Sequence, residues 1–213
     1  MDALQRTPAD ARFLYVLAHG AGAGMRHPFM ETIAELLAGQ GVATYRYEFP
    51  YMRDGRRRPD PPGVLKETVS QAVERARASA DACAVLAGGK SLGARMTSLA
   101  AAEGTLPGVS GLVFLGFPLH APGKPGIGRA EHLDDIALPM LFIQGTRDSL
   151  ADAGLMQDVC ERLGSKATLH FVEGGDHSFK VLKRSGRQRD DVMLEIAETI
   201  SNWSCRNFSR AES

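Results

Sequence analysis

The chain has 213 residues, 44% hydrophobic and 23% charged, a composition typical of a globular protein that buries one core. Lysine plus arginine and aspartate plus glutamate number 25 each, so net charge gives no reason to expect nucleic acid or an anionic membrane as a partner. Three cysteines without C-x-x-C spacing argue against disulfides and against a metal site.

The hydropathy of the chain favours one soluble domain. The first ten residues lack the basic and then apolar pattern of a signal peptide, and no stretch approaches the ~18 apolar residues of a membrane span. Unpaired cysteines fit a reducing compartment. We expect a single domain over residues 1–213, with a core at about 12–204, a polar tail at 205–213 and a cytoplasmic location.

Apolar runs alternate with helical patterns along the chain. Six short apolar runs are expected as strands: 12–18, 42–49, 82–86, 111–116, 139–144 and 167–172. Five patterns with apolar residues three or four apart are expected as helices: 28–37, 65–76, 92–100, 155–163 and 192–203. Two regions rich in proline and glycine, 50–63 and 117–128, are expected as loops.

This alternation predicts an α/β protein, a three-layer α/β/α sandwich around a mostly parallel six-stranded sheet. Ligands of such sheets lie beyond the carboxyl ends of the strands, so the residues that directly follow each strand are the candidates for a functional site. The strands at 42–49 and 167–172 are expected at the sheet edges, where they could pair or be covered, and the oligomeric state is left open.

Ser91 is the first candidate. The segment Gly89-Lys90-Ser91-Leu92-Gly93 fits G-x-S-x-G and stands between an expected strand and an expected helix, which is the setting of a nucleophile elbow. A turn this tight leaves little room for side chains beside the serine, and glycine stands on both sides. The alternative is a serine that only caps the following helix.

Asp148 and His177 complete a candidate catalytic triad. Asp148 follows the expected fifth strand and His177 the expected sixth, so the order along the chain is serine, acid, histidine. The imidazole would take the serine proton and pass it to the leaving group, while the carboxylate orients the ring. Asp152 and His170 are rivals, but Asp152 falls within the next helical pattern and His170 inside a strand pattern.

A negatively charged tetrahedral intermediate needs N–H donors. One would be the backbone N–H of Leu92, directly after the serine, and the other most plausibly that of Ala21, in the glycine-rich loop after the first strand. His19 is expected to support this loop by hydrogen bonding rather than to take part in the chemistry. Cys83 is expected to be a small core residue.

The motifs H-G-A-G, G-G-K-S-L-G, G-T-R-D and G-D-H-S resemble those of α/β hydrolases. The longer segments H-G-A-G-A-G-M-R-H-P-F-M and F-L-G-F-P-L-H-A-P-G-K-P resemble the subgroup of testis-expressed and NSL-complex-subunit proteins, near dienelactone-hydrolase-like enzymes. The resemblance covers about residues 13–203. It implies a minimal hydrolase fold, ester or thioester cleavage through Ser91, Asp148 and His177, and no cofactor.

The chain departs from that family in three respects. It has no room for the usual two N-terminal antiparallel strands, the loop after Gly116 is too short for a large lid, and Lys90 stands where esterases often have an aromatic residue or histidine. Lys90, His120 and Arg53 are possible contacts for an anionic substrate group, or else a solvated charge and two loop residues. Residues that could line an acyl pocket, or simply fill the core, are Met25, Met52 and Phe117.

The leading hypothesis is therefore a serine hydrolase that cleaves a small ester or thioester through an acyl-enzyme. Its partner would be a small-molecule substrate, with no nucleic acid and no membrane. The alternative is a catalytically silent binding or scaffold protein that keeps the hydrolase fold, because a fold alone does not establish an activity.

Overall fold

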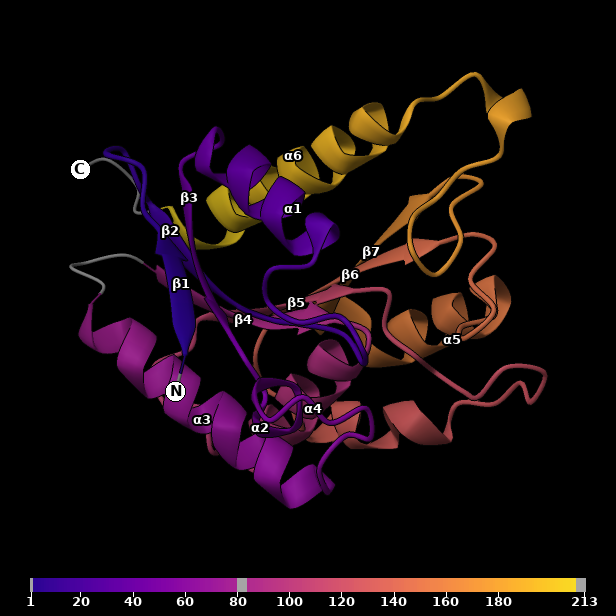
Figure 1. Cartoon of the computed structure of the whole chain (residues 1–213). Helices are drawn as coiled ribbons and strands as arrows, with labels where there is room; N and C mark the ends of the chain where they lie inside the picture. Colours follow the sequence, from indigo (N-terminus) through magenta and orange to yellow (C-terminus); the bar gives the residue numbers. More distant parts are fainter. Residues whose placement is uncertain (1, 80–83, 210–213) are drawn as a thin grey trace.

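The computed structural model describes residues 2–79 and 84–209 (Figure 1). Within these residues, seven strands form one sheet: β1 (Ala3–Arg6), β2 (Phe13–Ala18), β3 (Val42–Tyr47), β4 (Ala84–Lys90), β5 (Gly111–Leu115), β6 (Met140–Gly145) and β7 (Ala167–Val172). Their order across the sheet is β1-β3-β2-β4-β5-β6-β7, and every neighbouring pair is parallel except β1 with β3.

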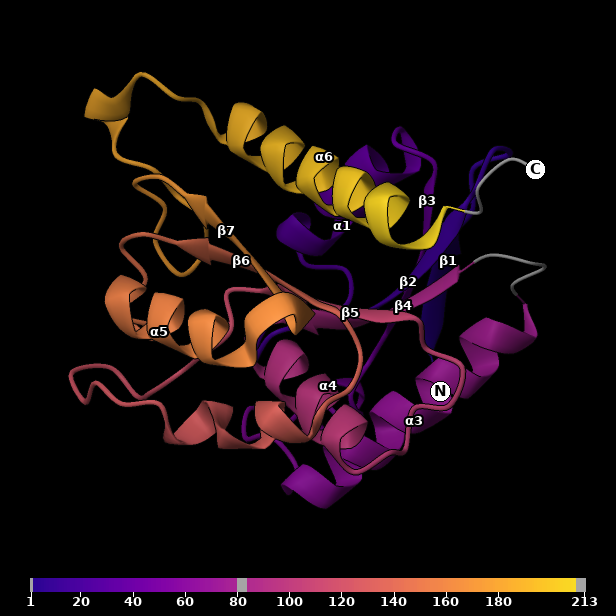
Figure 2. The ribbon, with the colours of Figure 1, turned by 180° about the vertical axis from the view of Figure 1, so that it is seen from behind.

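The sheet is covered on both faces, as the sequence predicts. Two helices cover one face: α1 (Pro28–Ala38) and α6 (Arg189–Phe208). Three cover the other: α3 (Pro62–Ala78), α4 (Leu92–Ala102) and α5 (Ala153–Leu163) (Figures 1 and 2). Short helical turns lie in the connections: α2 (Pro50–Arg53), η1 (Gly128–Asp135), η2 (Gly164–Lys166) and η3 (Lys183–Ser185). No helix in the described ranges is long and apolar enough to span a bilayer.

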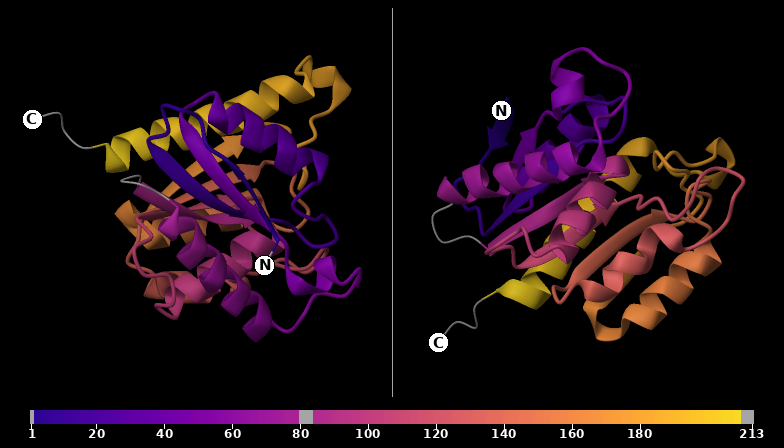
Figure 3. Two further views of the ribbon diagram at one scale, coloured as in Figure 1. Left: turned by 60° about the vertical axis from the view of Figure 1, so that its left-hand side comes forward. Right: turned by 90° about the horizontal axis from the view of Figure 1, so that it is seen from below.

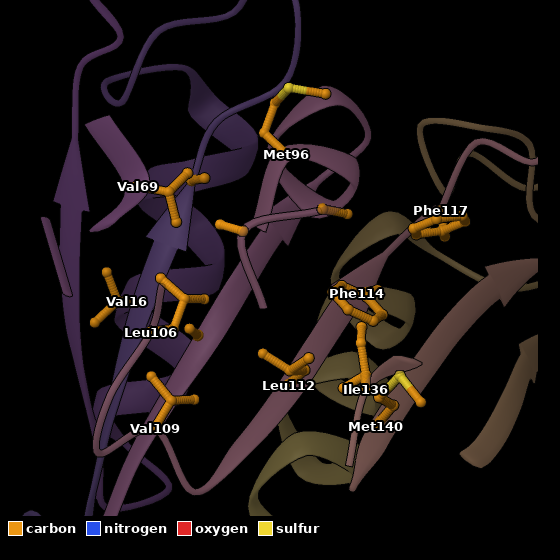
Figure 4. Packing of buried hydrophobic residues seen from close by; sticks show 14 of the residues in the cluster. Val16, Val69, Met96, Leu106, Val109, Leu112, Phe114, Phe117, Ile136 and Met140 are labelled. Carbon is orange, nitrogen blue, oxygen red and sulfur yellow. The ribbon is translucent and has the colours of Figure 1, made fainter. Parts of the chain in front are cut away.

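Two hydrophobic clusters hold the three layers together, one on each face of the sheet. Alternate residues of the strands point to opposite faces, so that Phe13 and Tyr15 join the α1/α6 cluster while Leu14 and Val16 join the other. Figure 4 shows part of the second cluster, in which Phe114 and Ile136 lie near Met140. The central strands are buried on both faces, which explains why they read as continuous apolar runs.

The expectation of six strands was wrong by one. β1 adds to the sheet edge antiparallel to β3, with Ala3 opposite Tyr47 (left view of Figure 3). Its four residues are half-buried to exposed and carry no apolar run, so the pattern gave no strand signal. β3 is therefore not an edge strand, and the edges of the sheet are β1 and β7.

The expected loop at 50–63 was also only partly correct. It begins with the helical turn α2 and ends inside α3, since Pro50 and Pro62 each stand in the first turn of a helix, where a missing N–H costs nothing. The expected strand at 82–86 is extended by β4 to Lys90, and Cys83 lies outside the described residues.

Asp152 provides a test of local stability. Its side chain accepts a hydrogen bond from the N–H of Leu155 at 3.0 Å and caps α5. Asp152→Ala should lower the free energy of unfolding by about 1 kcal/mol, measured by urea titration, because one N-terminal donor of the helix loses its acceptor. Asp158→Ala, on the exposed side of the same helix, should leave the unfolding midpoint unchanged. An equal effect of the two substitutions would contradict this role.

Candidate active site

Ser91 lies in the sharp turn between β4 and α4. Its backbone φ of 51° is in the left-handed region, which is strained for a residue with a side chain. The Ser91 N–H donates to the carbonyl oxygen of Leu115 at 3.0 Å and so ties the turn to the end of β5. The side chain occupies the N-cap position of α4 but makes no capping hydrogen bond. The Ser91 hydroxyl therefore stays free for another partner.

The turn packs closely against the end of β2. A Cβ on Gly89 would lie 2.4 Å from the carbonyl oxygen of Ala18, and a Cβ on Gly93 would lie 2.7 Å from the carbonyl oxygens of Ala18 and His19. Such distances are too short for any side chain. Glycine on both sides of the serine is thus required by this backbone contact.

The structure brings together the serine, histidine and aspartate that the sequence selects. Ser91 Oγ lies 2.8 Å from His177 Nε2, and His177 Nδ1 lies 2.7 Å from Asp148 Oδ2. Because an ionised carboxylate only accepts, Nδ1 carries the proton in the neutral ring, and Nε2 accepts from the serine hydroxyl. The three side chains form one continuous hydrogen-bonded chain.

Asp148 is held in place by two further donors. Gln144 Nε2, at the end of β6, donates to Oδ2 at 2.6 Å, and the N–H of Leu150 donates to Oδ1 at 2.8 Å. The carboxylate is fully buried and makes three hydrogen bonds in all. The sequence analysis did not identify Gln144. Its position four residues before the aspartate, at a strand end, was the available signal.

The rival residues have other partners. Asp152 caps α5, and His170 Nε2 lies 2.7 Å from Glu195 Oε1 on α6. A second serine–histidine pair also occurs, with Ser98 Oγ 2.7 Å from His132 Nε2. Ser98 is fully buried in α4, and among the described residues no carboxylate makes a hydrogen bond with His132. The serine of this pair therefore has no access to solvent, and the pair has no orienting acid among the described residues.

The turn that carries His177 is rigid. Asp176 Oδ1 accepts hydrogen bonds from the backbone N–H groups of Ser178 at 2.8 Å and Lys180 at 2.9 Å. Phe179, two residues after the histidine, is buried and has a φ of 61°, which is again in the strained left-handed region. This local network fixes the backbone on which the imidazole is mounted.

The two N–H groups expected to bind an oxyanion are unoccupied. Over the described ranges, neither the N–H of Ala21 nor that of Leu92 donates a hydrogen bond to another residue. His19 supports the Ala21 loop, because its Nδ1 donates to the carbonyl of Gly20 at 2.8 Å and its Nε2 accepts from the N–H of Phe49 at 3.1 Å. Burial lowers the pKa of His19, which suits this neutral form.

A cavity of about 600 Å³ opens beside Ser91 on the side of α1 and α6. Its lining combines apolar and basic side chains, and no described lining residue is acidic. The lining residues are Gly20, Ala21, Ala23, His27, Pro28, Phe29, Met30, Lys90, Ser91, Leu150, His177, Ser178, Phe179, Lys180, Arg189 and Met193.

Of the three expected substrate contacts, the structure brings only Lys90 to this cavity. Both ring nitrogens of His120 hydrogen-bond to backbone groups, at Ala121 and Asp152, and the side chain is buried. Arg53 lies on α2 and pairs with the carboxylate of the following residue. The three residues considered for an acyl pocket, Met25, Met52 and Phe117, do not line it either. Lys180 and Arg189 do, and the sequence analysis missed them.

Taken together, these groups can withdraw the proton of a serine hydroxyl and hold a developing negative charge near two free N–H groups. Comparison with known proteins agrees with the fold. The chain matches the family of α/β hydrolase domains over residues 11–205 and belongs to that family.

Solved structures of similar fold cover nearly the whole chain. A dienelactone hydrolase from Anabaena variabilis has a TM-score of 0.73 at 21% identity, over 97% of this chain and 92% of that one. A serine hydrolase without a lid from Xanthomonas campestris gives 0.71 at 20%, over 95% and 88%. Est1E from Butyrivibrio proteoclasticus, with ferulic acid bound, gives 0.74 at 15%, over 97% and 94%. Here too, residues 116–127 form a loop and no lid is evident.

The close packing of the turn makes a prediction about stability. Gly93→Ala should lower the free energy of unfolding by about 1–3 kcal/mol, because the new methyl group must push two carbonyl oxygens aside. Gly63→Ala is the matched control, since this glycine also stands near the start of a helix but has no neighbour within 4 Å. Thermal or urea unfolding of both variants measures the difference in stability. A Gly93 variant as stable as the Gly63 variant would show that the contact is unimportant.

Proposed function

We propose that this protein is a serine hydrolase that cleaves a small ester or thioester through an acyl-enzyme. The observation that carries the proposal is the hydrogen-bonded chain from Ser91 Oγ through His177 to Asp148. Ser91 is the nucleophile, His177 the general base and acid, and Asp148 the group that orients the ring. No cofactor is required for this chemistry.

The reaction follows from the positions of these groups. Ser91 Oγ attacks the carbonyl carbon of the substrate while its proton passes to His177 Nε2. The carbonyl oxygen, now negative, is bound by the N–H groups of Ala21 and Leu92. When the intermediate collapses, the bond to the alcohol or thiol breaks, and His177 returns the proton to this leaving group. Water then attacks the acyl-enzyme by the same route and releases the carboxylic acid.

The shape of the site favours small or flexible substrates. The cavity of about 600 Å³ is in the range of small-molecule sites, and the loop at 116–127 forms no lid over it. Apolar side chains of Phe29, Met30 and Met193 offer contacts to an acyl chain. The dienelactone hydrolase and esterase structures of similar fold support a substrate of this kind.

The mechanism is tested at the nucleophile. Ser91→Ala should lower kcat/KM for p-nitrophenyl acetate by about 10⁴-fold or more with little change in melting temperature, because it removes the attacking atom alone. A fluorophosphonate probe should add one adduct mass to wild type, located on Ser91. Ser98→Ala, in the other serine–histidine pair, should keep both activity and labelling. A folded wild-type protein without labelling or turnover would support the silent scaffold instead.

The lining of the cavity also supports an anionic group on the substrate. Lys180 and Arg189 line the cavity, are exposed, and form no ion pair within the described ranges. No described residue of the lining is acidic, so the cavity wall itself supplies no counterion for them. We propose that these two residues, rather than His120 or Arg53, attract a carboxylate at the end of the acyl group, with Lys90 adding to the field.

Two esters of equal chain length test this preference. The hydrogen adipate ester of p-nitrophenol should be cleaved with about tenfold higher kcat/KM than the hexanoate at low salt, and the advantage should shrink as salt screens the charges. Arg189→Gln should reduce the advantage. Arg206→Gln should not, because it lies about 25 Å away at the other end of α6. Equal rates for both esters in wild type would refute the proposed preference.

Three finer statements complete the proposal. We place the chain in the subgroup of testis-expressed and NSL-complex-subunit proteins, on the motifs quoted above. We regard residues 1–213 as one domain, since a single sheet and its two helical layers take up the described chain. The unpaired state of Cys160 and Cys205 supports a cytoplasmic location.

A further inference from the structure

Lys90 is the residue inside the serine turn that makes the most unusual contacts. Its Nζ donates to the backbone carbonyl oxygen of His177 at 2.6 Å and lies 3.5 Å from Nε2 of the same histidine. The ammonium also lies 5.4 Å from the centre of the Phe179 ring. The side chain that precedes the nucleophile therefore contacts both the backbone and the ring of the proposed base.

Gly116, just after β5, leaves room for the end of this side chain, because a Cβ on Gly116 would lie 2.8 Å from Lys90 Nζ. Gly20, in the loop that carries Ala21, lies beside the stem, and a Cβ there would be 3.6 Å from Lys90 Cγ, an ordinary contact distance. The lysine side chain thus passes the loop after β2 and reaches the His177 turn after β7.

The charge of Lys90 has no direct counterion. In the part of the chain that the structure describes, no carboxylate oxygen lies within 4.0 Å of Nζ. The charged or titratable groups that face it are Asp148, Asp176 and His177. The His177 ring is therefore the titratable side chain nearest to the cation.

We propose that Lys90 is a positioning residue for the base: its ammonium fixes the His177 backbone and so holds the ring beside Ser91 Oγ, ready to accept the serine proton. This inference rests on the proposed function. Lys90 acts through His177 and is not itself a catalytic residue. The hydrogen bond to a carbonyl is strongest while the amine is charged. Burial lowers the pKa of Lys90 to about 8, so that the charge is present at neutral pH and is lost in mildly alkaline solution.

The first test replaces Lys90 with a residue of similar length and no charge. Lys90→Met should lower kcat for the neutral ester p-nitrophenyl butyrate about tenfold at pH 7, with KM nearly unchanged, because the base is less well placed. The melting temperature should not fall, since a desolvated charge is removed from a half-buried position. Lys124→Met, on an exposed loop, is the control and should match wild type. If Lys90→Met lowers both the activity and the melting temperature, Lys90 has only a structural role and the proposal is wrong.

The second test is the pH profile. In wild type, kcat/KM should fall above about pH 8 as the amine loses its proton, and in Lys90→Met this fall should be absent. Lys90→Arg keeps a charge at all these pH values, so whatever activity it retains should also persist into the alkaline range. A profile above pH 8 that is the same in wild type and in Lys90→Met would overturn the proposal.

The third test does not depend on hydrolysis. In spectra of protein with ¹⁵N-labelled histidine at pH 7, the His177 ring signals should move between wild type and Lys90→Met, because the ammonium that holds the backbone of this residue and lies 3.5 Å from Nε2 is gone. Unchanged ring signals would refute the inference. The His177 signals could differ between wild type and Lys90→Met while wild type neither cleaves esters nor is labelled at Ser91. That result would refute the proposed function and leave the coupling of Lys90 to His177 intact.

Discussion

The contact between the β4–α4 turn and the end of β2 is the constraint on which the site depends. Gly89 and Gly93 touch the carbonyl groups of Ala18 and His19, so that the turn cannot relax away from its strained geometry. Because Ser91 is held with φ of 51°, its hydroxyl points away from the helix that it would otherwise cap and meets the imidazole.

Around this turn, hydrogen bonds hold the polar side chains of the site in their orientations. Asp148 accepts from three donors within the described ranges, one of them the Gln144 amide, and forms no salt bridge there to lysine or arginine, so hydrogen bonds satisfy the buried carboxylate. His19 is held by a backbone partner on each ring nitrogen, the carbonyl of Gly20 and the N–H of Phe49, and Glu48 Oε1 also lies 3.2 Å from Nε2. The site is thus built from strand ends and tight turns, which hold geometry better than long loops.

The sequence predicts the parts of this arrangement that depend on local pattern. Buried parallel strands give apolar runs, and the residues after them fall at one edge, so Ser91, Asp148 and His177 could be selected from the G-x-S-x-G motif, residue type, chain order and position after a strand. Contacts between distant segments leave no such pattern. Nothing local indicates that Arg189 at the start of α6 reaches the cavity, or that the polar segment of β1 pairs with β3.

Lys90 is a charged residue at a position where an apolar residue would suit the fold better. Its pKa, lowered by burial from 10.5 to about 8, means that the unfolded chain binds more protons than the folded one between these two pH values. Stability then rises with pH across this window, and below it the buried charge costs the fold on the order of a few kcal/mol. A methionine would avoid that cost. The retained lysine, aligned on the carbonyl and ring of His177, is therefore better explained by what it does to the base than by what it does for the fold.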